Sequence, residues 1–234
     1  MSAPIIKVYA GLSVGSADVQ RVLPGARFAE PVKRGDIPKD VADGVGVIVI
    51  VDGRFMQNLA VTPGELMDAL RRGTRLYGCS SMGAMRAVEL EPYGMIGHGE
   101  IFQHIRQTPY FGDDLLGLTF REDTLEPLTV PFVDLHFSLR DLRRRGKATT
   151  AQVKKVQDVF LALPFPDRTL RHVTTELARI HGRRADVLCS LAKVALGRAR
   201  QKRLDALGTL ARVKSDLRAV KAANRRLEMK KTRS

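Results

Sequence analysis

Short apolar runs recur along the first half of the chain. Three of them, at residues 5–10, 44–53 and 74–80, are continuous, and a weaker run at 26–32 contains a proline. Continuous apolar runs are typical of strands that helices cover on both faces, whereas proline favours a sheet edge or a strand end. The pattern therefore predicts four strands, of which the second along the chain is the weakest.

Amphipathic stretches with recognisable boundary residues predict helices between these strands. Residues 16–23 form one stretch, which proline and glycine stop, and residues 62–73 form another. The second stretch has a capping box of Thr62 and Glu65, a proline at its first position and a glycine at its end. A third helix is expected to open at Ser81.

The order of these elements predicts the fold class. Strand, helix, strand, strand, helix, strand and helix follow one another, with only a turn predicted at residues 33–38. Right-handed crossovers then produce an α/β fold with a mostly parallel open sheet and flanking helices. Because the carboxyl ends of parallel strands meet at one edge of an open sheet, we expect a ligand site at that edge.

The second half of the chain is predicted to be helical throughout. From about residue 119 the strand pattern changes to a short hairpin or loop and then to amphipathic stretches that glycine and proline separate. Residues 184–228 are interpreted as one long helix or a helical hairpin, with Gly208 as the expected break. The predicted division is an α/β core at 1–120 and a basic helical region at 121–234.

Charge is distributed unevenly between the two halves. Residues 1–137 hold 13 Lys and Arg against 17 Asp and Glu, whereas residues 138–234 hold 26 against 8. The halves therefore carry net charges of −4 and +18, and such asymmetry favours an acidic partner or nucleic acid for the second half. The last helix either packs on its own protein or serves as an arm for a partner or for self-association.

Composition excludes several classes of site. Cys79 and Cys189 are too few for a disulfide framework or a thiolate zinc site, and they fit the reducing cytoplasm, where we expect the protein to lie. The first apolar run is too short for a signal peptide or a membrane span. His98 and His104 are poorly spaced for one helical face, and neither a P-loop nor a dinucleotide loop is present. We therefore expect no metal, no cofactor and no membrane partner.

The strand-to-helix junction at residues 78–83 is the first candidate site. Its sequence, Gly-Cys-Ser-Ser-Met-Gly, places two serines between glycines that permit a tight turn. A serine held there lies beside the free N–H groups of a helix N-terminus, which can stabilise an oxyanion. The spacing does not fit the Gly-x-Ser-x-Gly elbow for either serine, so a structural helix cap and a nucleophile both stay open. Cys79 is predicted to be a buried, inert thiol.

Residues 52–106 contain a long, ordered series of motifs. The series comprises Asp52-Gly53-Arg54-Phe55, Ala60-Val61 with Glu65-Leu66, Gly73, Gly78, Ser81-Met82-Gly83-Ala84-Met85-Arg86-Ala87 with Glu89-Leu90, Gly94-Met95, Gly97, Gly99 and Ile101-Phe102. Together with Pro-Val-Lys-Arg-Gly-Asp-Ile at 31–37 and the pair Asp113-Asp114, these motifs closely resemble the core of the TfuA family. The resemblance covers about residues 5–120. The chain departs from the family near its start, where Ala10-Gly11-Leu12-Ser13 lacks a proline.

The resemblance implies an activity and partners. TfuA-like proteins are partners of YcaO enzymes, which use ATP to activate a peptide backbone amide and, with TfuA, form a thioamide. The family is proposed to hydrolyse the thiocarboxylated C-terminus of a ThiS-like sulfur carrier, to release sulfide, and to help YcaO hold its peptide. A Ser–Lys pair is the proposed catalytic centre. On this chain the resemblance implies Ser81 as the nucleophile, with an oxyanion held by the N–H groups of Met82 and Gly83.

The lysine of the proposed Ser–Lys pair is chosen by its position in the predicted fold. A lysine that acts as a base must be neutral, and burial can lower its pKa by several units from about 10.4. Lys7 lies inside the first predicted strand, whereas Lys33 and Lys39 precede the serine near a strand end. Lys33 shares the predicted sheet edge with Ser81 and is therefore the predicted base. The alternative interpretation of Lys33 is a solvated loop residue.

Supporting or binding roles are predicted for further residues at this edge. Arg34 stays protonated and could bind a carboxylate. Asp52 could orient Lys33 or a backbone turn, and Arg86 could face the site or pair with Glu89. The full supporting set is Arg34, Asp36, Asp52, Gly53, Gly78, Arg86 and Glu89.

Three functions compete at this point. The first is a TfuA-like hydrolase that works with a YcaO enzyme, a ThiS-like carrier and a target peptide. The second is a non-catalytic adaptor that docks the YcaO enzyme and its peptide. The third is a nucleic-acid binder, which is the weakest because the basic half lacks aromatic stacking motifs and any binding motif. Whether the protein is a homo-oligomer stays open.

Overall fold

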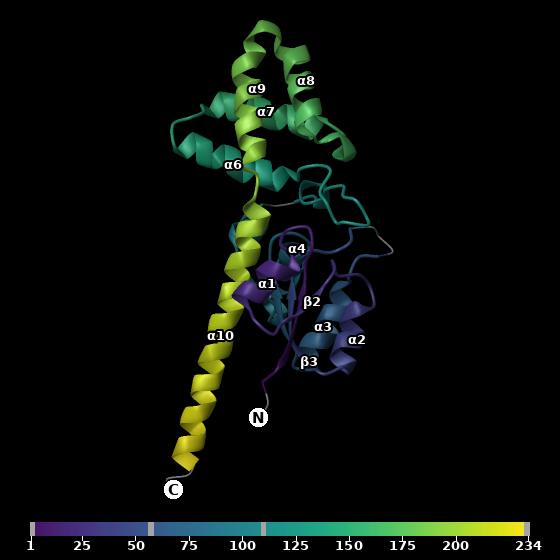
Figure 1. Ribbon diagram of the computed structural model, residues 1–234, viewed down its shortest axis with the longest axis vertical. Coiled ribbons are helices and arrows are strands. Elements are labelled where there is room, and N and C mark those ends of the chain that lie inside the picture. Colours follow the sequence, from purple (N-terminus) through teal and green to yellow (C-terminus); the bar gives the residue numbers. More distant parts are fainter. Residues whose placement is uncertain (1–2, 56–58, 109–110, 232–234) are drawn as a thin grey trace.

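The core of the molecule is a five-stranded, fully parallel sheet with the strand order β2-β1-β3-β4-β5 (Figure 1). The computed structural model describes residues 3–55, 59–108 and 111–231. The strands are β1 (Ile5–Tyr9), β2 (Arg27–Ala29), β3 (Val45–Ile50), β4 (Arg75–Gly78) and β5 (Ile96–Gly97). The four predicted strands are confirmed, and the weakest of them lies at an edge. The short β5 was not predicted.

Five helices follow the strands of the core. They are α1 (Ser16–Val22), α2 (Asp36–Ala42), α3 (Pro63–Arg71), α4 (Met82–Leu90) and α5 (Glu100–Gln107). The predicted capping box of α3 is present: the Glu65 N–H donates to the Thr62 hydroxyl at 3.3 Å, and the Thr62 N–H donates to the Glu65 carboxylate at 2.8 Å. Strands and helices together confirm the α/β class with an open parallel sheet.

Helix α2 lies where the sequence predicted only a turn. Gly35 adopts a φ of 85°, which glycine tolerates without strain, and it redirects the chain into the helix. The Asp36 carboxylate accepts the Lys33 N–H at 3.0 Å, and Pro38 falls in the first turn, where proline is tolerated. Glycine, aspartate and proline indicate a turn locally, but Ile37 is fully buried in the core and helps to hold the segment as a helix.

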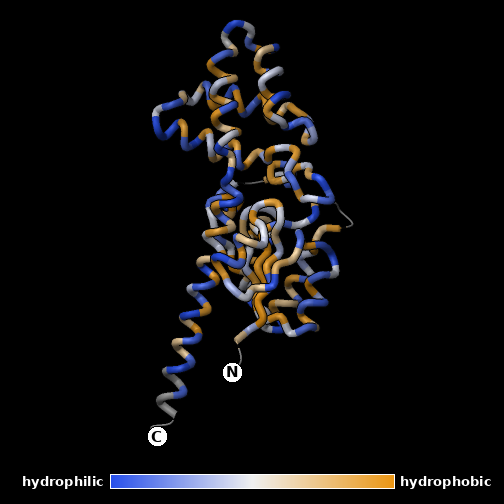
Figure 2. The backbone as a smooth tube through the Cα atoms, viewed as in Figure 1, coloured by the Kyte–Doolittle hydropathy of each residue, from blue (hydrophilic) through white to orange (hydrophobic). Residues whose placement is uncertain are grey.

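Side chains of the central strand alternate between two cores. Ile48 and Ile50 of β3 pack into one core with α2, α3, α4 and α5. Val47 and Val49 of the same strand, with the following Val51, pack into the other core, which α1 and the last helix, α10 (Gln201–Lys231), cover. Both sheet faces are therefore buried, which explains the continuous apolar runs. Figure 2 shows apolar residues concentrated in the strands.

A separate helical core follows the sheet. It is formed by α6 (Phe132–Arg144), α7 (Thr150–Ala162), α8 (Leu170–His181) and α9 (Ala185–Gly197), with fully buried Leu139, Phe160, Leu177 and Ala192 among its members. A capping box of Thr149 and Gln152 starts α7. These helices and α10 confirm the predicted helical C-terminal region. None of the described helices is both long enough and apolar enough to cross a bilayer.

The long helix predicted at 184–228 is broken, but not at Gly208. The break lies at residues 198–200, between α9 and α10, and Gly208 is inside α10. A Cβ at Gly208 would lie 3.3 Å from the His98 ring, so the glycine permits a close approach of α10 to the loop after β5. The first half of α10 then packs on the sheet through Ala206, Leu210 and Val213, and its last turns extend beyond the body (Figure 1).

Candidate functional site

A sharp turn joins β4 to α4 at the carboxyl edge of the sheet. Ser80 has a φ of 63°, which is uncommon for a residue with a side chain, and Ser81 caps α4 with φ −124° and ψ −120°. The Ser81 N–H donates to the carbonyl of Cys79 at 2.7 Å and to that of Val51 at 3.3 Å. These bonds fix the turn against the end of β3, and both serine side chains are almost completely buried.

Two glycines allow this turn to close. A Cβ built on Gly83 would overlap the carbonyl oxygen of Ile50 in β3. A Cβ built on Gly78 would overlap the carbonyl oxygen of Gly83. The first turn of α4 therefore rests directly on the backbone of the two central strands. Backbone contact of this kind leaves no space for a side chain, which is the physical reason for glycine at both positions.

The two serines have different surroundings. The Ser80 hydroxyl donates to the backbone carbonyl of Lys202 at 2.7 Å, and Ser80 is 0% exposed. Ser81 is 2% exposed, and its hydroxyl makes no hydrogen bond with any residue that the structure describes. Ser80 is thus engaged in holding α10 to the turn, whereas the Ser81 hydroxyl is uncommitted.

The N–H groups at the start of α4 are also unequal. The Gly83 N–H points toward the carbonyl of Val51 at 3.5 Å, a long hydrogen bond. Within the described parts of the chain, the Met82 N–H has no acceptor. Because the first N–H groups of a helix carry partial positive charge, the Met82 N–H is the more available of the two predicted oxyanion donors.

A lysine that the sequence did not single out lies at this turn. Lys202, in the first turn of α10, is 3% exposed, and its amine donates to the carbonyl of Leu116 at 3.1 Å. Burial lowers the pKa of the Lys202 amine, while the negative charges of Asp52 and Asp134 act in the opposite direction. An amine held this way has two N–H positions left after the bond to Leu116, and it is closer to neutrality than an exposed lysine.

Asp134 of α6 anchors the start of α10 beside the turn. Its carboxylate accepts the backbone N–H of Lys202 at 2.7 Å. Burial raises the pKa of Asp134 to about 6, and the charge and N–H groups of the α10 terminus oppose that shift. The helical region therefore places both an amine and a carboxyl group next to the serine turn, although neither belongs to the predicted α/β core.

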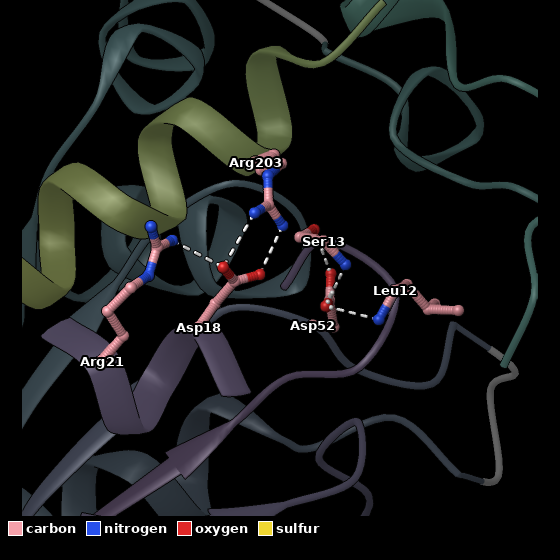
Figure 3. A network of polar contacts seen from close by, with 6 residues as sticks. All are labelled: Leu12, Ser13, Asp18, Arg21, Asp52 and Arg203. Carbon is pink, nitrogen blue, oxygen red and sulfur yellow. Dashed lines mark hydrogen bonds and ion pairs between the residues drawn. The ribbon is translucent and has the colours of Figure 1, made fainter. Parts of the chain in front are cut away.

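Asp52 fixes the loop after β1. Its carboxylate accepts the N–H groups of Leu12 and Ser13 at 3.0 and 2.8 Å and the Ser13 hydroxyl at 2.6 Å (Figure 3). Asp52 is 0% exposed, so these three bonds compensate for the loss of water around the carboxylate. The structure thus places Asp52 against a backbone turn at the carboxyl ends of β1 and β3.

A second carboxylate attaches α10 to the core in the same region. Asp18 of α1 accepts two hydrogen bonds from the Arg203 guanidinium, at 2.5 and 2.8 Å, and one from Arg21 at 2.7 Å (Figure 3). The bonds from Arg203 lower the pKa of Asp18. Because Arg203 follows Lys202 directly, this pair helps to fix the start of α10 over the sheet edge.

Lys33 lies at the predicted sheet edge but is exposed to solvent. The residue before it, Val32, bridges to Gly53 after β3, which places the segment beside the end of the central strand. A Cβ on Gly53 would lie 2.7 Å from the Met82 side chain, so the missing side chain lets the Lys33 segment and the start of α4 approach the same strand end. No hydrogen bond or ion pair of the described residues joins Lys33 to Ser81.

Arg86, Glu89 and Arg34, which the sequence also predicted for the site, bond to groups outside the turn. Arg86 pairs with Glu89 through two contacts of 2.7 Å and donates to the carbonyl of Val61 at 2.9 Å, which ties α4 to the start of α3. The Arg34 N–H donates to the carbonyl of Leu59 at 2.8 Å. Arg86 and Glu89 are therefore engaged with each other, and Arg34 lies on the exposed loop next to Lys33.

Other chemistries have less support at this site. Burial raises the pKa of the Cys79 thiol to about 12, so the thiolate needed for nucleophilic attack is strongly disfavoured. Within residues 3–55, 59–108 and 111–231, no three His, Cys, Asp or Glu side chains are grouped so as to hold a metal ion. The arrangement that stands out is a buried serine at a helix N-terminus, preceded by a serine whose hydroxyl bonds to the backbone of a buried lysine.

The family of the chain follows from its sequence match. Residues 52–169, just over half of the 234-residue chain, match the family described as TfuA-like protein. The match begins at Asp52, includes Ser81 and Asp134, and continues into the helical region, beyond the predicted limit near residue 120. Lys33 and Lys202 lie outside it. No curated protein matches the chain. The chain therefore belongs to the TfuA-like protein family, which is associated with YcaO-dependent thioamidation.

Proposed function

We propose that this protein releases sulfide from the thiocarboxylated C-terminus of a ThiS-like sulfur carrier and assists a YcaO enzyme in forming peptide backbone thioamides. The observation that carries the proposal is the uncommitted Ser81 hydroxyl at the N-terminus of α4, next to a buried lysine. Family membership supports the thioamidation context. A helix N-terminus and a neutral amine are the two features that acyl transfer to a serine requires.

The proposed reaction has two steps. The Ser81 oxygen attacks the carbonyl carbon of the thiocarboxylate while its proton moves to an amine, and the negative oxygen is held by the Met82 N–H and the start of α4. The amine gives this proton to the sulfur as the C–S bond breaks, so hydrosulfide leaves and the carrier stays bound to Ser81 as an ester. Water then attacks the ester and loses a proton to the amine, which passes it to the serine oxygen, and the carrier leaves with an ordinary carboxylate.

Two lysines compete for the role of the base. Lys33 is the sequence-based prediction and stays so, but its side chain is exposed to solvent, and no hydrogen bond of the described residues joins it to Ser81. We propose Lys202 as the second candidate and favour it, because its amine is buried, its pKa is lowered, and its backbone carbonyl is bonded to Ser80 next to the nucleophile. In this arrangement Asp52 and Asp134 limit how far the pKa of Lys202 falls.

The non-catalytic adaptor is the competing function. Its support is the burial of Ser81, which is only 2% exposed, so a carrier tail must reach a nearly closed turn. If the protein is only an adaptor, Ser80 and Ser81 have a structural role in the turn that α10 contacts. The two functions differ in whether the protein alone consumes a thiocarboxylate.

The direct test uses a thiocarboxylated ThiS-like carrier. The purified full chain is expected to release sulfide from it and to leave the carrier carboxylate, as measured by a sulfide probe and by intact-protein mass spectrometry. The carrier with an ordinary carboxylate is the blank. Absence of release, with binding of a YcaO enzyme retained in a pull-down, would contradict the hydrolase and leave the adaptor.

Replacing each lysine by methionine, which keeps the length of the apolar stem, separates the two bases. Lys202→Met is expected to lower kcat/KM for sulfide release by about 10²–10⁴-fold, the usual range for a lost general base, and Lys33→Met by less than about threefold. The wild-type rate should rise with pH through a pKa below the ordinary lysine value, and that limb should vanish in Lys202→Met.

The opposite result for the two lysine variants would identify Lys33 as the base. If Lys33→Met loses activity and Lys202→Met keeps both the rate and the pH profile, Lys202 is structural only. Circular dichroism and thermal unfolding of both variants control for the fold, because Lys202 also bonds to Leu116.

A further inference from the structure

The second half of α10 and the residue Lys214 just before it carry a row of cations that have no ion pair with a described residue. Lys214, Arg218, Lys221 and Arg225 follow one another at spacings of four, three and four residues, so they lie on one face of the helix. We call these four residues the basic stripe. It is about 16 Å long, from the rise of an α-helix. None of the four forms an ion pair with another described residue.

An apolar seam runs beside the basic stripe. Leu210 and Val213 are fully buried against the sheet, Leu217 is partly buried, and Val220 is 40% exposed. Their spacing of three, four and three residues is that of a helix–helix seam. The seam that α10 uses inside the molecule therefore continues outward past the point where the body ends (Figure 1).

The contacts of α10 with the rest of the molecule end near Asp216 and Leu217. The Asp216 carboxylate accepts the hydroxyl of Tyr77 in β4 at 3.0 Å and pairs with Arg212 at 2.9 Å. Beyond it the described side chains of α10 are exposed apart from Leu217. An isolated helical segment of this length is marginal in water, and this one leaves Val220, part of Leu217 and the outer cations of the basic stripe uncovered.

We propose that the projecting half of α10, through Arg218, Lys221 and Arg225 of the basic stripe and the adjacent Leu217 and Val220, docks an acidic amphipathic helix of a partner protein. Cations that have no ion pair with a described residue call for anions on the occupant, and the adjacent seam calls for an apolar face on it. The occupant continues the packing that Leu210 and Val213 begin within the molecule. This surface is independent of the proposed chemistry at Ser81.

Two other occupants fit less well. A second copy of the chain would bring the same basic stripe to the interface, and like charges oppose that pairing. Nucleic acid would satisfy the cations with phosphates but leave Val220 exposed, and residues 201–231 contain no aromatic side chain for stacking on bases. An acidic amphipathic helix would both pair with the cations of the basic stripe and cover the exposed end of the apolar seam.

The test measures binding to a defined probe by fluorescence anisotropy. The probe is a synthetic helix of a few heptads with leucine at a and d and glutamate at e and g. The variant Arg218→Glu, Lys221→Glu, Arg225→Glu is expected to weaken binding by at least about 30-fold. The matched control reverses three exposed cations without ion pairs in α6 and α7, namely Arg143→Glu, Arg144→Glu and Lys155→Glu, and is expected to change binding by less than about threefold.

Further arms decide between occupants. A probe with serine in place of leucine is expected to bind at least about tenfold more weakly, because it cannot cover the seam. Equal losses in both charge-reversal variants would show a net-charge effect and overturn the proposal. So would tighter binding of duplex DNA with the same dependence on the stripe, or concentration-dependent dimerisation in sedimentation. A second variant carries glutamine, instead of glutamate, at positions 218, 221 and 225. Circular dichroism of both variants shows whether α10 keeps its helical structure, so that weaker binding is not caused by unfolding of the helix.

Discussion

Ser81→Ala is expected to abolish sulfide release, with a fall in kcat of about 10³-fold or more, because the substitution removes the proposed attacking atom. Ser80, the adjacent serine, is held in a left-handed conformation with its hydroxyl bonded to Lys202. The loss should be measured as initial rates on the thiocarboxylated carrier. The stability of Ser81→Ala should be close to that of the wild type, since the Ser81 hydroxyl has no hydrogen-bond partner among the described residues.

The neighbouring serine supplies the matched control. Ser80→Ala removes the bond to the Lys202 carbonyl and should lower the stability by about 1 kcal/mol, while the rate stays within about tenfold of the wild type. The opposite pattern, with activity lost in Ser80→Ala and kept in Ser81→Ala, would contradict the assignment of Ser81. Full activity in both variants would leave only the adaptor function.

Gly83→Ala is expected to be among the most destabilising single substitutions in the chain, costing about 3 kcal/mol or more. The new Cβ would overlap the backbone carbonyl of Ile50, and a central strand cannot move away as a flexible side chain would. To relieve the overlap, α4 must lift from β3, which opens the turn that holds Ser81. Urea unfolding should show a lower midpoint with an unchanged slope.

Gly64→Ala is the matched control for this prediction. Gly64 lies in the first turn of α3, where a Cβ would meet only the Thr62 hydroxyl at an ordinary 3.9 Å. Alanine there should leave the stability unchanged or raise it by up to about 1 kcal/mol, because it restricts the unfolded chain. A Gly83→Ala variant as stable as Gly64→Ala would show that α4 does not rest on the strand backbone as described.

Much of the core could be predicted because local signals and tertiary packing agree there. The apolar runs form the strands, and the capping box at Thr62 starts its helix where expected. The turn at residues 78–83 was also identified before its geometry was known, because tight turns require glycine and a helix start exposes N–H groups. The TfuA-like motifs at residues 52–106 are also local, and the family match over residues 52–169 covers them.

Helix α2 and the break before α10 show where local signals mislead. Gly35 and Pro38 indicate a turn, yet burial of Ile37 supports a helix there. Gly208 indicates a helix end, yet the approach of His98 uses the glycine inside a continuous helix. In both cases the deciding contact is made with residues that are distant in the sequence, so helix and turn propensities alone do not predict it.

The candidate serine could be identified from the sequence alone, whereas the buried lysine proposed as its base could not. The nucleophile candidate depends on neighbours within a few residues, and those are visible in the motif at 78–83. Lys202 lies 122 positions after Ser80 in the sequence. It reaches the turn because α10 returns across the sheet edge, where Asp134 and the Arg203–Asp18 pair hold the start of the helix. Burial, which lowers the pKa of that amine, is a property of the packed molecule, and no local pattern in the sequence encodes it.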